Sequence, residues 1–570
     1  MVWEPTQFRY PRPIRWIAAL FGSDVVSFSV AGVRSARWTL GLGPWAPKKI
    51  PLPQAGKYAL SLKNECVMVD PVARQETIRR FADQAVKRLP TGQAGVHGRI
   101  HYSAALLEQV ANLVEHPVAI LGNFEPAYLD LPKEVLITCL EHHQKFFPVL
   151  VPHPNPLPKG EGADRPGEAK LLPFFVGIRN GVSVHQEVVR EGYERVLSAR
   201  LADARFFFNQ DRKTALASKV DALKGIMFQQ KLGNLFDKKE RVKQLLETFS
   251  STMGGFEGLE KAKRVADLCK ADLVTDMVRE FPELQGIMAR LYAKADGENA
   301  IVSQALEEQY WPITLTGALP TSDVAALVAL ADKLDTLAGD FAVGLIPTGS
   351  ADPYGLRRAA VGVLRILEDR SWNLNLEQLI DQAVRLQPVQ HNAEETKAKL
   401  LQFFRQRLSA ILEERDFKVD EIEAILESGI GVVPDSLARL KSLQGVRSND
   451  QFKSLAASHK RVKNILRQSN MSEPATDRQP QVELLKEEAE QQLFAILQKV
   501  QLEVAQHAEH KSYKESLLSM VVLSEPLANF FSKVMVMAED PTLKTNRIKL
   551  MYRVAQVFDT VADFSKLQNG

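Results

Sequence analysis

Cysteine and long apolar runs are scarce in this sequence, and each scarcity excludes a class of protein. Only three residues are cysteine, and Cys66, Cys139 and Cys269 lie far apart with no CxxC pair. This spacing indicates neither a disulfide framework nor a zinc finger, so we expect buried thiols. No stretch reaches the roughly 20 apolar residues of a membrane span, and the start, MVWEPTQFRYPRP, is not a signal peptide. We therefore expect a cytoplasmic protein that does not enter membranes.

A large excess of charge of one sign is also absent. Lysine and arginine number 72 and aspartate and glutamate 69, for a net charge of +3. Such a chain has no global positive field, so any binding of nucleic acid would need local basic patches. The length of 570 residues is too great for one core and predicts about three or four domains.

The stretch from Leu327 to Leu367 organises the rest of the chain. Its first half has apolar residues at three- and four-residue steps, which predicts a core helix with one buried stripe. Asp332 and Asp335 fall close to that stripe. A loop rich in glycine and proline follows, and then a second helix that begins with Arg357 and Arg358. A helix, a fixed loop and a basic helix start resemble a platform for RNA or phosphate.

Basic residues recur on three further predicted helices. Around Arg200 to Lys213 the core would be formed by Val196, Ala199, Leu201 and Phe208, and the candidate RNA contacts are Arg200, Arg205, Arg212 and Lys213. A solvated face paired with Asp203 and Asp211 is an equally good interpretation for any one of these arginines.

The other two basic helices lie near the C-terminus. In SHKRVKNILRQ the candidates are Lys460, Arg461 and Lys463, with Val462, Ile465 and Leu466 facing inward. The last helix has an apolar seam for packing in a bundle, formed by Leu550, Val554, Val557, Val561 and Phe564. Its start is expected to offer basic and polar side chains to solvent, namely Lys544, Asn546, Arg547, Lys549 and Arg553.

A series of sequence blocks, kept in one order, covers nearly the whole chain. In chain order they are HHQKFFPV (142–149), RLADARFFFNQDRK (200–213), FQQKLGNLFDKKERV (228–242), KADLVTDMVREFPELQGIMARLYAKADGE (270–298), ADKLDTLAG (331–339), DPYGLRRAAVGVLRIL (352–367) and ANFFSKVMVMAEDPTLKTNRIKLMYRV (528–554). Together these blocks resemble the beta-subunit family of bacterial tetrameric glycyl-tRNA synthetase.

The resemblance implies a multidomain, mainly α protein. Residues 1–190 mix strand-like and helix-like runs and would form an α+β domain similar to the B3/B4 type of tRNA synthetases. Residues 191–373 would form a degenerate HD-like helical domain, and residues 374–470 a helical body. Residues 471–482 are expected to be a linker, and residues 483–570 a helical anticodon-binding bundle.

The chain departs from the family's pattern at three places. The family has a further N-terminal domain, which we expect this chain to lack. Ser35 and Ala36 stand where relatives usually carry a Gly-His pair. A proline-rich insert at 152–169 interrupts two strands that should pair, and it is interpreted as a solvated linker rather than as a ligand for a partner protein.

The HD-like domain is expected to be inactive. Asp272 and Asp332 fall at the two aspartate positions of an HD metal site, but Ala271 replaces the paired histidine, and no histidine occurs between His185 and His391. Two carboxylates alone make a weak site for a transition metal. The spacing of Cys139, His142 and His143 could suggest zinc or a nucleophile pair, but no third ligand or orienting acid is near in sequence, so we expect fold residues and no metal.

Motifs for adenylate formation are missing as well. The chain has no P-loop, no GxGxxG after a strand, no HIGH-like and KMSKS-like pair, and no arginine-bearing motif pair of class II synthetases. We therefore expect no catalytic residue and no cofactor in this chain. The resemblance implies that ATP and Mg²⁺ act on a separate alpha subunit in an α2β2 assembly, and that this chain binds tRNA(Gly) and no DNA.

Three other functions stay open at this stage. A metal-dependent phosphohydrolase would show a bound metal and hydrolysis by this chain alone. Editing of mischarged tRNA by the α+β domain is a second, although a pocket for glycine already rejects larger amino acids sterically. A truncated RNA-binding remnant is the third.

Overall fold

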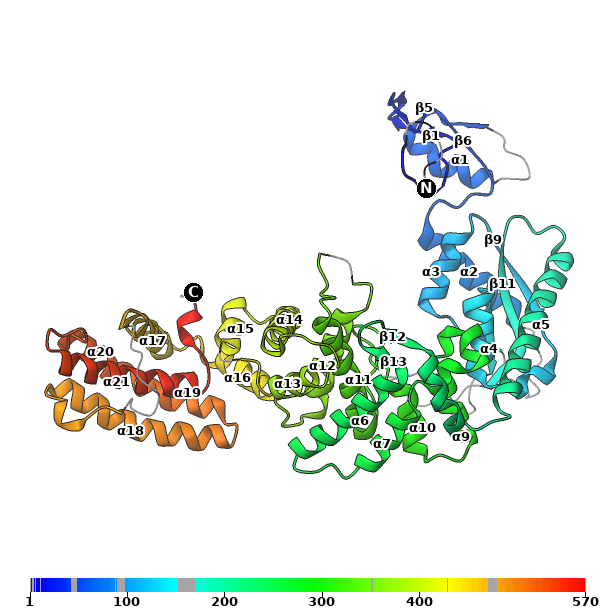
Figure 1. The fold of residues 1–570 in the computed structure, drawn as a ribbon. Helices are drawn as coiled ribbons and strands as arrows, with labels where there is room; N and C mark the ends of the chain where they lie inside the picture. Colours follow the sequence, from blue (N-terminus) through cyan, green and yellow to red (C-terminus); the bar gives the residue numbers. More distant parts are fainter. Residues whose placement is uncertain are drawn as a thin grey trace. The chain divides into compact units, whose positions relative to one another are not determined.

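The computed structural model describes residues 2–568 apart from 3, 4, 6, 11, 43–48, 88, 90–97, 152–169, 350–351, 428 and 470–478. The chain forms two compact units. The first consists of residues 1–213 with 275–284, and the second of residues 214–274 with 285–570 (Figure 1). No helix among the described residues is long and apolar enough to cross a membrane.

The first unit begins with short strands. A three-stranded sheet has the order β1-β5-β4, and two strand pairs, β2-β3 and β6-β7, accompany it. Their bounds are β1 (Ile17–Ala18), β2 (Leu20–Phe21), β3 (Asp24–Val25), β4 (Ser29–Val30), β5 (Val33–Ala36), β6 (Trp38–Leu40) and β7 (Lys49–Pro51), followed by α1 (Tyr58–Asn64). Ser35 lies in β5, where its buried hydroxyl accepts a hydrogen bond from the Phe28 backbone N (3.0 Å) and donates one to the Val26 carbonyl (2.6 Å).

A four-stranded antiparallel sheet follows in the same unit. Its order is β8 (Arg99–Ile100), β10 (Phe147–Val151), β11 (Lys170–Asn180) and β9 (Pro117–Asn123). Val151 pairs with Lys170 across β10 and β11, which confirms that the proline-rich insert interrupts two paired strands. The insert itself, at 152–169, lies outside the described residues.

Helices cover both faces of this sheet (Figure 1). On one face Ile78 of α2 (Pro71–Val86) and Leu107 of α3 (Ala104–Leu113) pack with Val176 of β11. Because side chains alternate along a strand, the neighbouring Gly177 faces the opposite side. There Tyr193 of α5 (Gln186–Asp211) lies so close that a Cβ on Gly177 would be 2.7 Å from its ring. This α+β arrangement is the one that the sequence predicts.

Helix α5 differs from the prediction in two ways. It runs as one helix through the boundary expected at 190/191, and it belongs to the first unit. Its buried residues are Leu197, Leu201, Ala204 and Asp211, whereas the expected core residues Val196 and Ala199 are exposed. The buried face of α5 therefore differs from the predicted one, because contact with the sheet decides which residues of the helix are buried.

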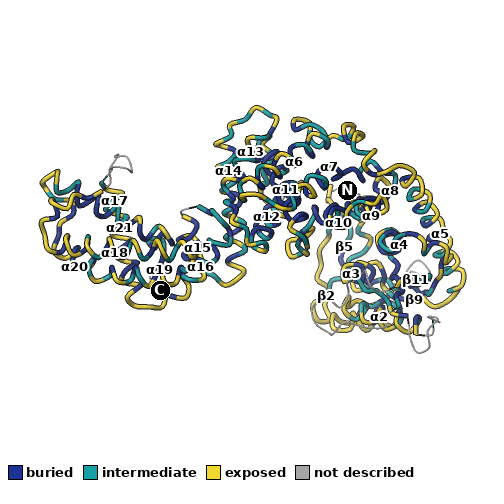
Figure 2. Tube along the Cα trace, turned by 90° about the horizontal axis from the view of Figure 1, so that it is seen from below, coloured by how far each residue is buried: buried dark blue, intermediate teal, exposed yellow. Residues whose placement is uncertain are grey.

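The second unit is helical and is built around α11 (Asp323–Ala342). Helices α6, α7, α10, α12, α13 and α14 all contact α11, so it is buried on every side (Figure 2). The expected single buried stripe was therefore wrong, but the central place of this stretch is confirmed. The helices that contact α11 are α6 (Leu235–Thr252), α7 (Leu259–Leu268), α10 (Ala300–Glu308), α12 (Leu356–Arg370), α13 (Leu376–Arg385) and α14 (Ala393–Glu413). Helix α9 (Ile287–Ala295) belongs to the same unit, whereas α8 (Asp276–Glu280) belongs to the first unit.

The C-terminal part of the second unit is a bundle. It contains α15 (Val419–Leu426), α16 (Val433–Val446), α17 (Asp450–Ser469), α18 (Glu488–Glu509), α19 (Tyr513–Val521), α20 (Ser524–Lys533) and α21 (Pro541–Asp559). Helix α17 packs against α20 and α21, although the prediction placed it in the preceding body. The expected linker at 471–482 lies mostly outside the described residues.

The predicted seam of the last helix is confirmed. Leu550, Val554 and Val557 are buried in α21. Val561 and Phe564 are buried too, but they follow the helix, because α21 ends at Asp559. Asp540 caps the start of α21 by accepting hydrogen bonds from the backbone N of Thr542 (2.8 Å) and Leu543 (3.3 Å). The fold class, mainly α and multidomain, is as expected.

Candidate nucleic-acid interface

The exposed side of α17 is a basic face. Lys453, Lys460 and Arg467 lie seven residues apart, so the 3.6-residue period of the helix places them on one side. Arg461 is exposed next to them. The opposite side is buried and includes Phe452, Leu455, Ala456, His459 and Val462. We call Lys453, Lys460, Arg461 and Arg467 the basic face of α17.

Two of these four cations have a partner among the described residues. The Lys453 ammonium lies 2.8 Å from the Asp450 carboxylate, which is itself exposed. The Arg461 guanidinium lies over the Phe531 ring at 4.3 Å from its centroid. Lys460 and Arg467 form no ion pair or hydrogen bond to another described residue. Solvated cations of this kind are available to phosphate groups.

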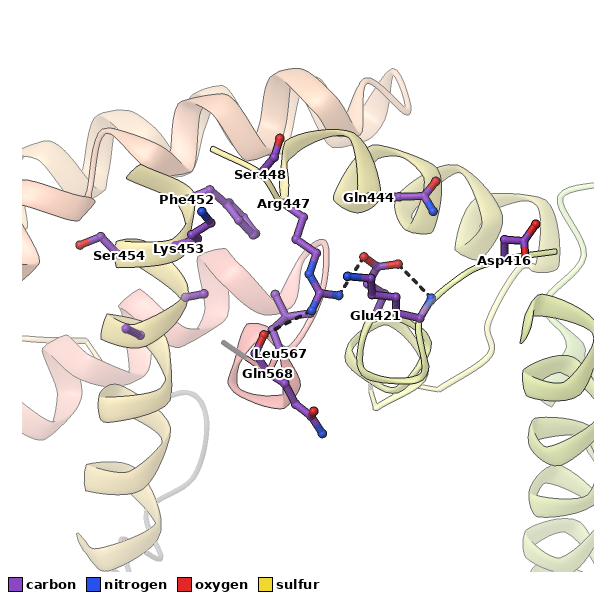
Figure 3. A pocket seen from close by; sticks show the side chains of 13 residues that line it. Asp416, Glu421, Gln444, Arg447, Ser448, Phe452, Lys453, Ser454, Leu567 and Gln568 are labelled. Atoms are coloured by element: carbon purple, nitrogen blue, oxygen red, sulfur yellow. Dashed lines mark hydrogen bonds and ion pairs between the residues drawn. The ribbon is translucent and has the colours of Figure 1, made fainter. Parts of the chain in front are cut away.

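A cavity of about 630 Å³ opens beside this face, between α15, α16, α17 and the C-terminal residues (Figure 3). Lys453 lines it, so the cavity and the basic face share a residue. Its Arg447 is already held, since the guanidinium lies 2.5 Å from Asp420 and 2.8 Å from Glu421 and donates to the Gln568 carbonyl at 3.2 Å. Lys418, Gln444 and Ser448 supply further polar groups to the wall.

Three residues at the start of α21 are not where the sequence placed them. Asn546, Arg547 and Lys549 were expected in solvent, but all three are buried, because α18 packs against this part of α21. The Arg547 guanidinium lies 2.5 Å from the buried Glu490 carboxylate and donates to the Met535 carbonyl at 2.9 Å. Asn546 exchanges hydrogen bonds with the Gln481 backbone, at 2.7 and 3.0 Å.

Lys544 and Arg553 of the same helix are half-buried. Arg553 donates to the Gln501 side chain at 2.5 Å. Their contact with RNA stays a prediction.

The candidate residues of α5 divide into two pairs. Arg200 and Arg205 are half-buried: Arg200 lies 2.6 Å from Glu280 and over the Phe281 ring, and Arg205 lies over the Tyr128 ring. Arg212 and Lys213, at the end of the helix, are exposed.

The expected alternative partner Asp211 is buried. It accepts hydrogen bonds from the backbone N of Asp276 and Met277, both at 3.0 Å, and so holds the start of α8.

Arg357 and Arg358 stand at the start of α12. Asp352 caps this helix by accepting from the backbone N of Leu356 and Arg357, both at 2.9 Å, and the Arg357 guanidinium donates back to the Gly349 carbonyl. Arg357 thus fixes the loop, while Arg358 is exposed. The loop-and-helix platform expected here exists, but its contact with phosphate stays a prediction.

The positions of the HD metal site hold an ion-pair network instead. The Asp332 carboxylate lies 3.1 Å from the Lys270 ammonium and 3.3 Å from that of Lys238. Asp335 lies 2.9 Å from Lys238 and 2.7 Å from Arg241. Burial alone would raise the pKa of Asp332, but the neighbouring ammonium groups outweigh it and hold this pKa below its ordinary value.

This donor set does not fit a divalent metal. Two ammonium groups already neutralise the Asp332 carboxylate, and Ala271 offers no ligand. Asp272 has a structural role, because its side chain is fully buried and accepts a hydrogen bond from the Gly286 backbone N at 2.6 Å. The network therefore has no imidazole that could hold a metal ion for phosphate hydrolysis.

Cys139, His142 and His143 lie together on a single turn, Cys139–His143. Burial raises the pKa of the Cys139 thiol to about 12, so it is not a thiolate at neutral pH. His143 lies against the Phe281 ring, and one of its ring nitrogens is 3.0 Å from Arg200. Cys269 is also buried, as expected, and Cys66 is half-buried.

Lys453 was not among the residues that the sequence predicts to contact RNA, whereas Lys463 was, and its contact with RNA stays a prediction. The seven-residue spacing of Lys453, Lys460 and Arg467 was visible in the sequence and would have found the first. Lys463 turns away from this face and lies 2.7 Å from Asp559. Only the position of α21 beside α17 could have shown this.

Comparisons with known proteins match two families to most of the chain, and relatives of one name to all of it. The family described as "Glycyl-tRNA synthetase beta subunit" matches residues 1–427, and the family described as "DALR anticodon binding domain" matches residues 455–564. Proteins named "Glycine--tRNA ligase beta subunit" from Trichlorobacter lovleyi and Geobacter metallireducens are each 39% identical over all of this chain, which covers 78% and 79% of their lengths. The corresponding protein of Desulforamulus reducens is 37% identical, with 78% of its length covered.

Proposed function

This chain belongs to the glycyl-tRNA synthetase beta-subunit family, and we propose that it binds tRNA(Gly) and positions it for transfer of glycine. The adenylate would form from glycine, ATP and Mg²⁺ on a separate alpha subunit, with which this chain would assemble as α2β2 in the cytoplasm. Positioning alone can contribute on the order of 7–11 kcal/mol to lowering a barrier, so a subunit without reacting groups can still be essential for turnover.

The observation that carries this proposal is the basic face of α17. It lies within residues 455–564, the region similar to an anticodon-binding domain, apart from Lys453 just before it. From Lys453 to Arg467 the face extends about 21 Å along the helix, at the usual rise of 1.5 Å per residue. Phosphate contacts along such a stripe would supply affinity without regard to sequence.

The cavity beside α17 would bind a base of the RNA and so discriminate between RNA sequences. RNA-binding proteins read unstacked bases through hydrogen bonds to their edges and through packing against their faces. Lys418, Gln444 and Ser448 provide polar groups at this wall, whereas the carboxylate of Glu421 is already paired with Arg447. We infer that a base from a single-stranded loop of the tRNA enters this cavity while its phosphates follow the basic face.

Arg212, Lys213 and Arg358 would form further contacts with the tRNA. All three are exposed, and Arg212 and Lys213 lie in the first unit, whereas Arg358 lies in the second. A contact in each unit would let one chain hold two regions of the same tRNA.

Binding of tRNA(Gly) across a series of salt concentrations tests the proposal. The variant Lys460→Ala/Arg467→Ala should bind more weakly, and its plot of log affinity against log salt should be flatter by roughly one unit per lost phosphate contact. Lys399→Gln is the matched control, because Lys399 is also an exposed helical lysine but lies on α14. Equal slopes for the wild type and the double variant would refute the assignment of this face.

A further inference from the structure

An imidazole is buried without a hydrogen-bond partner on the inner side of α17. His459 has no exposed surface, and neither ring nitrogen has a hydrogen-bond partner among the described residues. Both nitrogens instead face carboxylates: Nε2 lies 4.0 Å from Asp559, and Nδ1 lies 3.8 Å from Asp563. Buried polar atoms are rarely left in this state unless a water or an ion completes them.

Aromatic rings enclose the other sides of this imidazole. Phe558 and Phe564 meet it edge to face, with ring centroids 4.8 and 5.7 Å away. Two parts of the chain that lie far apart in sequence thus meet at one point, namely α17 and the segment from the end of α21 to Asp563. The backbone N of Asp563 also donates to the Ala424 carbonyl of α15 at 2.9 Å, so the position of this segment is fixed.

The charges at this point do not balance. Two carboxylates are present, and among the described residues the only cation in an ion pair with them, apart from the imidazole itself, is the Lys463 ammonium, 2.7 Å from Asp559 and 3.5 Å from Asp563. With a neutral imidazole, the group has one negative charge in excess. The Asp563 side chain is only 11% exposed, whereas that of Asp559 is 39% exposed, so solvent offsets part of this excess at Asp559 and little of it at Asp563.

We propose that His459, Asp559 and Asp563 bind a divalent transition-metal ion, of which Zn²⁺ is the best match. One ligand atom from each residue can be chosen so that all three lie within 4.8 Å of one another. One imidazole and two carboxylates are a ligand set that zinc takes, with bonds of about 2.0–2.2 Å. Bonds of this length place tetrahedral ligand atoms about 3.3–3.6 Å apart, so the most widely separated of the three atoms would need to approach by about 1.2–1.5 Å.

The role of such an ion would be structural. It would join α17, which has the basic face on its other side, to the end of α21, and so hold the RNA-binding surface in place. Lys463 competes with it, since the ammonium occupies the same Asp559 carboxylate. The metal must therefore displace this side chain, and removal of the ammonium should strengthen binding of the metal.

The test uses the full chain, stripped with a chelator, and Zn²⁺ or Co²⁺ as the probe. We expect one equivalent of Zn²⁺ by calorimetry, a higher Tm with Zn²⁺, and visible absorption bands with Co²⁺. Asp559→Asn and His459→Ala should each lower the affinity at least tenfold, and circular dichroism shows whether they fold. His510→Ala is the control, because His510 is exposed on the same bundle.

Lys463→Gln provides the sharpest arm of this test. The proposal predicts that this variant binds Zn²⁺ several-fold more tightly than the wild type. If neither protein binds the metal, if only Lys463→Gln binds it, or if Asp559→Asn and His459→Ala bind as the wild type does, the proposal is overturned. If only Lys463→Gln binds Zn²⁺, the cation that pairs with Asp559 and Asp563 in the wild-type protein is the Lys463 ammonium and not a metal ion.

Discussion

The Lys270 ammonium lies 3.1 Å from the Asp332 carboxylate, where the resemblance to an HD domain would place a metal ion. Lys238 reaches the same carboxylate and also Asp335, so lysine side chains supply the positive charge that a metal would otherwise bring. Instead of activating water, the side chains at this site form ion pairs that join α6, α11 and the turn that follows α7. This polar network lies at the centre of the second unit.

Within this network, substitution of Asp335 should lower the free energy of unfolding the most. It has no exposed surface, and Lys238 and Arg241 both depend on it. Asp335→Ala would leave these cations partly unpaired in the core, which should lower the free energy of unfolding by about 3–5 kcal/mol. Urea unfolding measures this. Asp450→Ala, which removes an exposed ion pair with Lys453, should change little. Equal effects of the two substitutions would contradict the role given to the network.

Glu141 gives the first unit a dependence on pH. It is buried, its nearest ionisable partner is His101 at 3.8 Å, and burial raises its pKa from 4.5 to about 7. A raised carboxyl pKa means that stability is fully present below pH 4.5 and is lost as pH rises toward 7, by on the order of 3 kcal/mol.

The variant Glu141→Gln removes this titration. We expect it to match the wild type near pH 4 and to unfold at a higher temperature than the wild type at pH 8. Thermal melts followed by circular dichroism at both pH values check this. Melting curves of the two proteins that shift in parallel between pH 4 and 8 would show that Glu141 ionises normally in the folded protein.

Gly177 is required by the close approach of Tyr193. A methyl group at Gly177 would lie 2.7 Å from the Tyr193 ring and 3.0 Å from that of Phe146. Gly177→Ala should therefore destabilise the sheet by about 1–3 kcal/mol. The control is Gly192→Ala on the neighbouring helix, where a Cβ meets no atom within 4 Å and alanine should stabilise by about 0.5–1 kcal/mol. Opposite signs in urea unfolding are the expected result, and destabilisation by both would count against the packing described.

Substitution of a buried arginine of the bundle should lower its stability, whereas substitution of an exposed lysine should weaken binding of tRNA. Arg547→Ala leaves the buried Glu490 carboxylate unpaired, so it should lower stability by about 3–5 kcal/mol. Lys460→Ala removes an exposed cation, so it should leave the Tm unchanged and weaken binding of tRNA. A thermal melt and a binding curve for each variant separate the two cases. Weaker tRNA binding by folded Arg547→Ala protein, with an unchanged Tm, would mean that Arg547 contacts RNA directly.

The sequence predicted the parts of the structure that depend on local pattern. The seam of α21 and the core helix around Leu327 followed from periodicity, and the pairing of the strands on either side of the insert was expected from the resemblance to the family. It did not predict which polar residues would be buried. Asn546 and Arg547 looked solvent-facing because their partners, Gln481 and Glu490, lie far away in sequence.

Partners in space decided the candidate site as well. Lys463 looks like a member of the basic face until Asp559, on another helix, is seen to bind it. The missing histidines indicated an inactive HD site, but that Lys238 and Lys270 fill it could be seen only once α6 and α11 were side by side. Basic residues at regular spacing are visible in a sequence, whereas the acids that neutralise some of them are not.

Aminoacylation of tRNA(Gly) with glycine, by this chain alone and mixed with the cognate alpha subunit, tests the central claim most directly. We predict activity only in the mixture, and reduced activity at limiting tRNA when the chain carries Lys460→Ala/Arg467→Ala. Full activity by this chain alone would mean that it contains a site for adenylate formation. Full activity by the alpha subunit alone would show that this chain does not position the tRNA. Either result would contradict the account.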